Sequence, residues 1–218
     1  MQQPANYSFW SPKYWQAIHV IAMLYVKNNE SAPEAARCFY YSLSRLLPTE
    51  EAKWTVQQFI SDYPIDNYLS SGERLFYWTW LMHNTVRRKQ GKQDFPLRSA
   101  SALYDESALT KSDWGGPVWF ILHYTAKTMP EQIPQGMSTS FKALIVCLQY
   151  LLPCPKCRKH LALNLVQLHI DDYIWAKDSL FLWTVLLHNQ VNKDLNKPFI
   201  PVDQAWNLYT APKAIPQR

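Results

Sequence analysis

Apolar side chains recur every three or four residues along most of this chain, the spacing expected of helices that bury one face. In the first half this pattern predicts helices over residues 14–27, 32–47, 50–61 and 72–90. In the second half it predicts helices over residues 114–128, 137–152, 155–168 and 177–195, with a short fifth near 204–209. Short links that contain proline join several of them and suit antiparallel neighbours in a bundle. The chain is therefore expected to be all-α.

The same pattern of residues occurs twice, at an offset of about 105 residues. Trp10, Trp15 and His19 return as Trp114, Trp119 and His123, and the pair His83-Asn84 returns as His188-Asn189. Self-similarity in this order indicates a tandem duplication of one helical unit. We expect a first, degenerate unit over residues 1–95, a linker over 96–113 that is partly helical near 101–109, and a second unit over 114–218.

Composition narrows the class of protein. The chain has 218 residues, 15% of them aromatic and only 5 of them glycine, which fits two helical units with an aromatic interior. The net charge of +5 is spread without a block of Lys or Arg, so nucleic-acid binding is not expected. No apolar stretch approaches the roughly 18–20 residues that span a bilayer, so no membrane association is expected. The start of the chain lacks a basic segment followed by an apolar run, so no secretion signal is expected.

The chemistry of the chain centres on Cys154-Pro155-Lys156-Cys157. Pro153 ends the preceding helix, and Pro155 suits the first turn of the next one. Both sulfurs are therefore expected at a helix N-terminus, where free N–H groups and neighbouring cations favour a thiolate. Such thiols have pKa values lowered from about 8.5 to roughly 3.5–7.5, which suits disulfide exchange.

Two other interpretations of the cysteine pair stay open at this point. Half a zinc site would need further ligands such as His160 or His169, and the chain has no second Cys-x-x-Cys. A static disulfide is the other alternative. The first unit has Thr49-Glu50-Glu51-Ala52 at the matching positions, which predicts an ordinary capped helix start. Cys38 and Cys147 lie in apolar helical runs and are expected to be buried free thiols, so no shuttle pair is expected.

Four ordered motifs make the second unit resemble the Erv/ALR family of FAD-linked sulfhydryl oxidases. They are Trp-Gly-Gly-Pro-Val-Trp-Phe-Ile-Leu-His over 114–123, Pro-Cys-Pro-Lys-Cys over 153–157, His-Asn-Gln-Val-Asn-Lys-Asp-Leu-Asn-Lys-Pro over 188–198, and Val-Asp-Gln-Ala-Trp over 202–206. The first unit is similar to the degenerate Erv-like unit of quiescin and baculovirus sulfhydryl oxidases. Its repeat-matched residues Trp15, His19, His83 and Asn84 are interpreted as structural remnants, with a second, unproductive flavin as the alternative.

The resemblance implies a helical bundle that holds FAD with its isoalloxazine ring against the cysteine pair. It assigns catalysis to Cys154, as the outer sulfur attacked by substrate, and to Cys157, as the inner sulfur that passes electrons to the flavin. It implies no metal. The cofactor-binding residues that it implies are Trp114, Trp119, His123, Cys157, His188, Asn189, Val191, Asn192, Leu195, Lys197 and Trp206. A planar cofactor with an anionic pyrophosphate does require aromatic faces, directed polar groups and a cation.

The function that follows from the resemblance is oxidation of protein dithiols to disulfides, with dioxygen reduced to hydrogen peroxide. The alternative is a non-catalytic helical flavoprotein or interaction scaffold that kept the fold. The resemblance also implies pairing, because Erv-like domains commonly form homodimers. We expect the two units to make this pairing within one chain as an intramolecular pseudo-dimer, since a tether of about 20 residues replaces a bimolecular encounter. A homodimer in addition to this pairing stays open. By analogy with viral members, the virion or the cytoplasm of an infected cell is the favoured location.

Overall fold

The computed structural model describes residues 6–25 and 29–210 of the chain. Over these residues the protein forms ten α-helices and two short 3-10 helices, and no β-strand. The all-α prediction is confirmed. The first five α-helices are α1 (Tyr7–Met23), α2 (Ala32–Leu46), α3 (Glu50–Asp62), α4 (Gly72–Lys89) and α5 (Leu97–Leu103). The second five are α6 (Lys111–Thr128), α7 (Gln135–Leu151), α8 (Pro155–Gln167), α9 (Lys177–Asp194) and α10 (Val202–Leu208).

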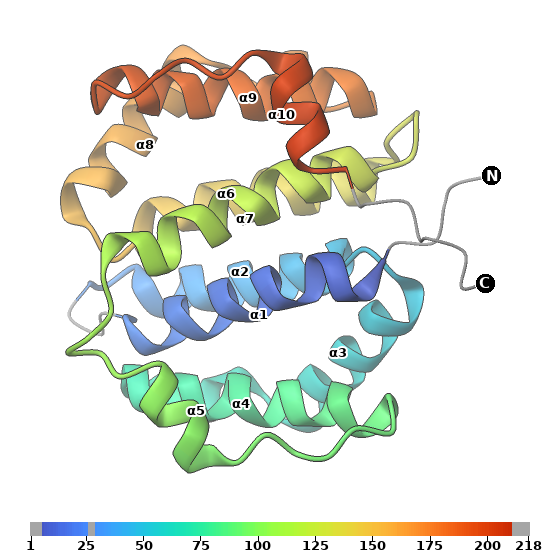
Figure 1. Ribbon diagram of the computed structural model, residues 1–218, viewed down its shortest axis with the longest axis vertical. Helices are drawn as coiled ribbons and strands as arrows, with labels where there is room; N and C mark the ends of the chain where they lie inside the picture. The colour runs from blue at the N-terminus through green and yellow to red at the C-terminus, as the bar shows by residue number, and fades with distance from the viewer. Residues whose placement is uncertain (1–5, 26–28, 211–218) are drawn as a thin grey trace, which may run out of the picture.

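The two units are stacked through their first two helices (Figure 1). Helices α1 and α2 of the first unit pack against α6 and α7 of the second, while α3–α5 and α8–α10 lie on the two outer sides. The buried hydroxyls of Tyr14 and Thr125 share a hydrogen bond of 2.6 Å across this boundary. The rings of Phe9 and Phe120 also meet across it, with centroids 5.6 Å apart. The predicted intramolecular pseudo-dimer is therefore confirmed.

The helix starts in the structure correct two of the predicted boundaries. Helix α1 begins at Tyr7, not at residue 14, because Pro12 is accommodated inside it and Trp10 packs in the core. Helix α6 begins at Lys111, not at residue 114, because Thr110 and Asp113 form a capping box there. Residues 26 and 27 of the predicted first helix lie outside the described residues, as do the outer ends of both predicted units.

Helix α5 also differs from its prediction. The expected helix at 101–109 is instead Leu97–Leu103, which stands at the repeat offset from α10. Tyr104 packs on His19 with ring centroids 5.0 Å apart, as Tyr209 packs on His123 at 4.6 Å. We therefore propose that the first unit extends to Tyr104, beyond the expected boundary at 95. Within the described residues, no helix combines the length and the apolar character needed to cross a bilayer.

Candidate active site at the cysteine pair

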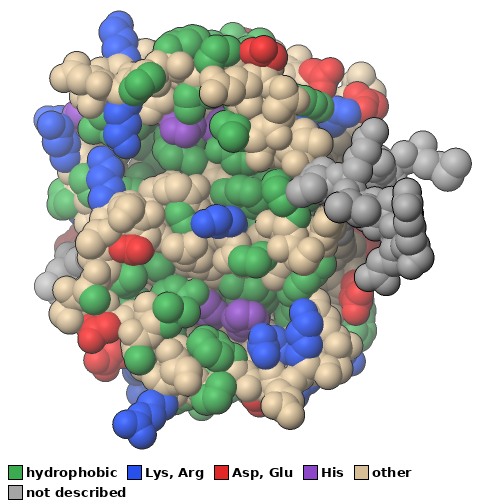
Figure 2. All heavy atoms as spheres, in the orientation of Figure 1, with side chains coloured by type: hydrophobic (Ala, Val, Ile, Leu, Met, Phe, Trp, Pro, Cys, Tyr) green, Lys and Arg blue, Asp and Glu red, His purple; other side chains and the backbone are tan. Residues whose placement is uncertain are grey.

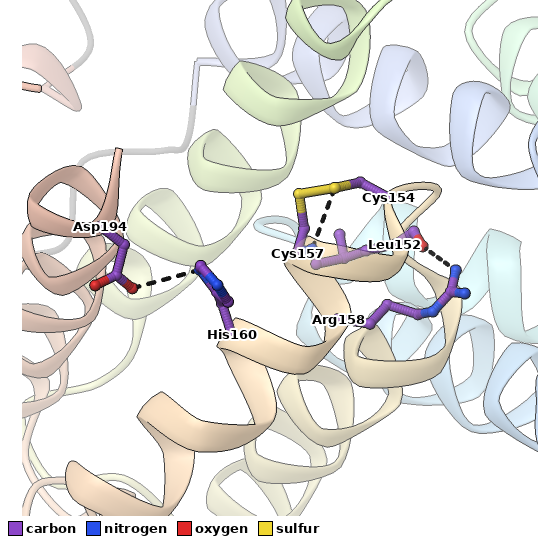
Figure 3. Close-up of a disulfide and its surroundings, with 6 residues drawn as sticks. All are labelled: Leu152, Cys154, Cys157, Arg158, His160 and Asp194. Carbon is purple, nitrogen blue, oxygen red and sulfur yellow. Dashed lines mark hydrogen bonds and ion pairs between the residues drawn. A yellow bond between two sulfur atoms is a disulfide. The ribbon is translucent and has the colours of Figure 1, made fainter. Parts of the chain in front are cut away.

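The cysteine pair lies at the start of α8, as the two prolines predict (Figure 3). Cys154 is the N-cap residue, and its Sγ accepts a hydrogen bond of 3.1 Å from the backbone N–H of Cys157. The two sulfurs are joined in a disulfide. Arg158 donates from Nη1 to the carbonyl oxygen of Leu152 at 2.7 Å, which ties α8 to the end of α7. The first turn of the helix thus presents the disulfide with a backbone donor directed at one of its sulfurs.

The disulfide borders a pocket of about 480 Å³ between α6, α8 and α9. This volume lies within the roughly 300–1,000 Å³ of typical small-molecule sites. The predicted residues that line the pocket are Trp114, Trp119, Cys154, Cys157, His188, Val191, Asn192, Leu195 and Lys197. Lys and Arg side chains gather on the surface at the α8 edge of the molecule (Figure 2).

A chain of hydrogen bonds supports the aromatic wall of this pocket. The rings of Trp119 and His188 stack with centroids 4.0 Å apart and planes 6° apart. Behind them, His123 contacts His188 from Nε2 to Nδ1 at 2.9 Å and Thr184 from Nδ1 to Oγ1 at 2.8 Å. Thr184 in turn donates its hydroxyl hydrogen to the carbonyl oxygen of Phe181 at 2.7 Å. Both ring nitrogens of His123 and the Nδ1 atom of His188 are therefore paired.

The direction of these hydrogen bonds determines which nitrogen atoms of the two histidines carry a proton. Burial lowers the pKa of His123 well below its usual value, with the nearby His188 acting in the same direction. Burial also lowers the pKa of His188 to about 4, with Lys197 acting in the same direction. Both rings are thus neutral at pH 7. Because Thr184 has given its hydrogen away, His123 donates from Nδ1 and accepts at Nε2 from His188. The Nε2 atom of His188 is then an unprotonated acceptor.

Three predicted cofactor residues do not line the pocket but support its walls. His123 lies behind His188, as described above. Asn189 holds the segment after α9 through two hydrogen bonds to the backbone of Ile200, at 2.8 and 2.9 Å. Trp206 packs edge-on against Phe181, with centroids 4.8 Å apart, and lies under the ammonium group of Lys127.

Comparison with known proteins decides the family. The model of the Erv1 / Alr family matches residues 12–107 and again residues 117–210. The chain belongs to the Erv1/Alr family. The first match runs past Tyr104, in agreement with the assignment of α5 to the first unit. Membership places the chain among FAD-binding thiol oxidases.

Individual relatives align with about one unit of the chain. The FAD-linked sulfhydryl oxidase ERV1 of Oryza sativa subsp. japonica is 28% identical over 112 residues, which cover 48% of this chain and 55% of the rice protein. The FAD-linked sulfhydryl oxidase of African swine fever virus (isolate Pig/Kenya/KEN-50/1950) is 24% identical over 108 residues, which cover 49% of this chain and 88% of the viral protein. This chain thus spans little more than half of the rice protein's length.

Sequence reasoning missed several residues that line the pocket of this Erv1/Alr chain. Lys111 and Ser112 were missed because the helix was expected to begin after them. Tyr209 could have been found from the repeat, since its counterpart is Tyr104. His160 stands three residues after Cys157 on the same helix, and that spacing was the available signal. The other missed lining residues are Gly115, Gly116, Val118, Leu122, Leu148, Leu152, Lys156 and Leu161.

The chemistry of the lining suits FAD. The stacked Trp119 and His188 rings offer a flat wall, and apolar side chains make up most of the remainder. Lys111, Lys156 and Lys197 supply positive charge for a pyrophosphate. Asn196, two residues after the end of α9, has a φ of 53°, a conformation that asparagine tolerates, and the Lys197 N–H then donates to the Asn192 carbonyl at 2.8 Å. Lys197 is thereby fixed at the pocket's edge. Among the described residues, no group of three His, Cys, Asp or Glu side chains is arranged to hold a metal ion.

Proposed function

We propose that this chain oxidises pairs of thiols in protein substrates to disulfides through Cys154 and Cys157, with dioxygen as the final oxidant and hydrogen peroxide as the product. The observation that carries the proposal is the Cys154–Cys157 disulfide at a helix N-terminus, bordering a pocket that suits a flavin. Membership of a thiol oxidase family supports the same conclusion.

The proposed exchange begins when a substrate thiolate attacks Sγ of Cys154, which breaks the disulfide and releases Cys157 as a thiolate. A second substrate thiolate then attacks the substrate sulfur of the mixed disulfide and releases Cys154. The backbone N–H of Cys157, which donates to Cys154 Sγ, favours the negative charge on that leaving sulfur. The basic side chains at the start of α8 act in the same direction.

A bound FAD supplies the two-electron acceptor that links the cysteine pair to dioxygen. Within the protein, Trp119 and His188 would hold its flat ring system, and Lys197 would contact its phosphates. The unprotonated Nε2 of His188 is a fixed acceptor for a hydrogen-bond donor in the pocket. Because the histidine pair is neutral, it orients a ligand without adding charge beside the cysteines.

The proposal is tested with the purified protein and a small dithiol. We expect a bound flavin, seen in its absorption band, and peroxide release when the dithiol and dioxygen are present. Changing Cys157→Ser should abolish peroxide release while the flavin stays bound, and Cys154→Ser should do the same. The matched control changes Cys38 and Cys147 to Ala, which should leave turnover largely intact because both are free thiols outside the pocket. Bound flavin without any peroxide from the unmutated protein would instead support the non-catalytic scaffold.

A further inference from the structure

Helix α8 lies on an outer side of the second unit, and one exposed face of it runs away from the cysteine pair (Figure 1). Lys159, Leu163 and Val166 are exposed along this face, at spacings of four and three residues that place them on one side of a helix. We call these three residues the outer face of α8. At a rise of about 1.5 Å per residue, Leu163 lies about 14 Å along the helix axis from Cys154, and Val166 lies about 18 Å from it. A polypeptide bound at Cys154 is thus within a few residues of this face.

The two aliphatic side chains of this face are largely exposed. Leu163 is 54% exposed and Val166 is 69% exposed. Single exposed apolar residues are ordinary on protein surfaces, but these two are neighbours on the same side of the helix. The matching positions of α3 are also exposed, and they hold the polar residues Gln58 and Ser61. Since the first unit folds with polar residues there, the fold does not require apolar ones.

The charge of α8 also differs from that of α3. Helix α8 contains Lys156, Arg158 and Lys159 and no acidic residue, whereas α3 has two glutamates in its first turn. Cations close to the start of a helix oppose its dipole, so they do not stabilise α8. Arg158 is tied to the end of α7, and Lys156 borders the flavin pocket. Lys159 is exposed and forms no ion pair with another described residue, which leaves its ammonium group available to a partner.

Charge and position indicate what covers this face. A second copy of the chain would bring the same cationic face, or another surface of a chain whose net charge is +5, against Lys159. A dithiol substrate must by contrast place a thiolate beside Cys154, at the start of the same helix. The segments that flank its cysteines are then within reach of Leu163 and Val166, and acidic residues in them complement the cations.

We propose that the outer face of α8 is the docking surface for the protein substrate of the oxidase, and that it selects acidic segments with an apolar residue near the reacting cysteine. This inference rests on the proposed function. Lys159 pairs with a carboxylate of the substrate, while Leu163 and Val166 bury its apolar side chain. An extended chain advances about 3.4 Å per residue, so that side chain stands about four or five residues from the cysteine that attacks Cys154.

The test compares three peptides as substrates of the FAD-saturated full chain, with peroxide release as the readout. The first peptide has two cysteines, aspartates beside them, and a leucine about four residues beyond the cysteines on each side. The second has lysine in place of each aspartate, and the third has serine in place of each leucine. We expect the first peptide to have a KM lower by about tenfold or more than either of the others, with a similar kcat. Dithiothreitol, which is too small to reach the outer face, provides the reference activity.

Substitutions on α8 should remove this preference. Leu163→Gln with Val166→Ser installs the residues of the first unit and should raise the KM for the first peptide by about tenfold or more, without a change in kcat. Lys159→Gln should bring the KM values of the acidic and basic peptides together. The matched control is Trp54→Gln, which removes an exposed apolar side chain at the α3 position that corresponds to Lys159 and should change none of these values. Turnover of dithiothreitol should stay the same in all these variants, since the side chains are exposed and outside the flavin pocket.

Peptide KM values that both α8 variants leave unchanged would overturn the proposal, as would an equal loss of activity with dithiothreitol. So would light scattering that shows a dimer of the unmutated protein and a monomer of the double variant, because a second copy would then cover the face. If no dithiol yields peroxide, the proposed function fails, and docking is decided separately by fluorescence anisotropy. The labelled first peptide, with serine in place of its cysteines, should bind the unmutated protein and bind about tenfold more weakly to the double variant. Equal binding to both proteins would overturn the docking proposal.

Discussion

The two units contain nearly the same aromatic–histidine constellation, yet only one of them encloses a usable pocket. In the first unit Trp15 stacks on His83 at 4.0 Å, and His19 joins His83 at 3.0 Å, just as Trp119, His188 and His123 do in the second. The cavity beside the first stack measures only about 20 Å³, against about 480 Å³ beside the second. The stacked rings are therefore part of the fold, and they do not by themselves indicate a cofactor site.

Larger side chains close the first cavity from the α1 side. Tyr7 stands where the second unit has Lys111, and its hydroxyl accepts a hydrogen bond of 3.4 Å from Trp15 Nε1. Lys92 is the counterpart of Lys197, and its Nζ lies 5.1 Å from the centroid of the Tyr7 ring. Lys197, by contrast, borders the flavin pocket. Tyr14 replaces Val118 and packs edge-on against Trp10 at 5.1 Å. These exchanges argue against a second flavin in the first unit.

The largest expected effect comes from moving the cysteine pair between units. Thr49 caps α3 through a hydrogen bond of 3.3 Å from Ala52 N, as Cys154 caps α8, so Thr49→Cys with Ala52→Cys should form a disulfide. In a protein that also carries Cys154→Ser and Cys157→Ser, peroxide release should nevertheless stay at background, because no flavin pocket adjoins the grafted pair. Mass spectrometry checks the disulfide, and a peroxide assay checks the activity. Recovered activity would show that the first cavity opens far enough to work.

Matched histidine substitutions compare the two constellations directly. His188→Ala removes the ring that stacks on Trp119 and lines the pocket, so we expect flavin affinity to fall by about tenfold or more, a loss of roughly 1.4 kcal/mol. His83→Ala removes the equivalent ring beside a closed cavity, so flavin affinity should not change, although unfolding should require less denaturant. Flavin titration and denaturant unfolding of both variants separate the two effects. Equal loss of flavin from both variants would contradict the comparison.

Much of this organisation could be predicted from the sequence, because it depends on periodicity and on local signals. The repeat predicted two units, and the prolines around Cys154 predicted a helix that begins there. The start of α1 was missed because Pro12 looks like a boundary when the burial of Trp10 is unknown. The difference between the two cavities was not predicted either. The difference in cavity volume depends on whether the side chains of Tyr14 and Val118 point inward. Their direction is set by tertiary packing, which the sequence pattern does not show.

Buried histidines in both units should make the free energy of unfolding fall as the pH is lowered. Burial lowers the pKa of His83 to about 3 and that of His188 to about 4, so both are neutral in the folded protein above those values. The unfolded chain binds protons at these side chains below about pH 6.5, and stability is therefore lost as the pH falls from about 6.5 towards 4. Each histidine should contribute on the order of 2–3 kcal/mol to this loss. Denaturant unfolding from pH 7 to 4 should show a smaller slope in His83→Gln and in His188→Gln. A slope unchanged in both variants would exclude this origin.

The smallest expected effect tests whether the two units unfold together. Tyr14 and Thr125 come from different units, and their hydrogen bond of 2.6 Å is buried between α1 and α6. Thr125→Val keeps the shape of the side chain but leaves the Tyr14 hydroxyl without its partner, which should cost about 1–3 kcal/mol. If the units form one cooperative structure, the loss should shift a single unfolding transition, whether it is followed by flavin release or by tryptophan fluorescence. Thr128→Val is the matched control, because the Thr128 hydroxyl bonds only within α6, to the carbonyl oxygens of Tyr124 and Thr125. Two separate transitions, with only one displaced by Thr125→Val, would show that the first unit folds independently and does not act as a scaffold for the second.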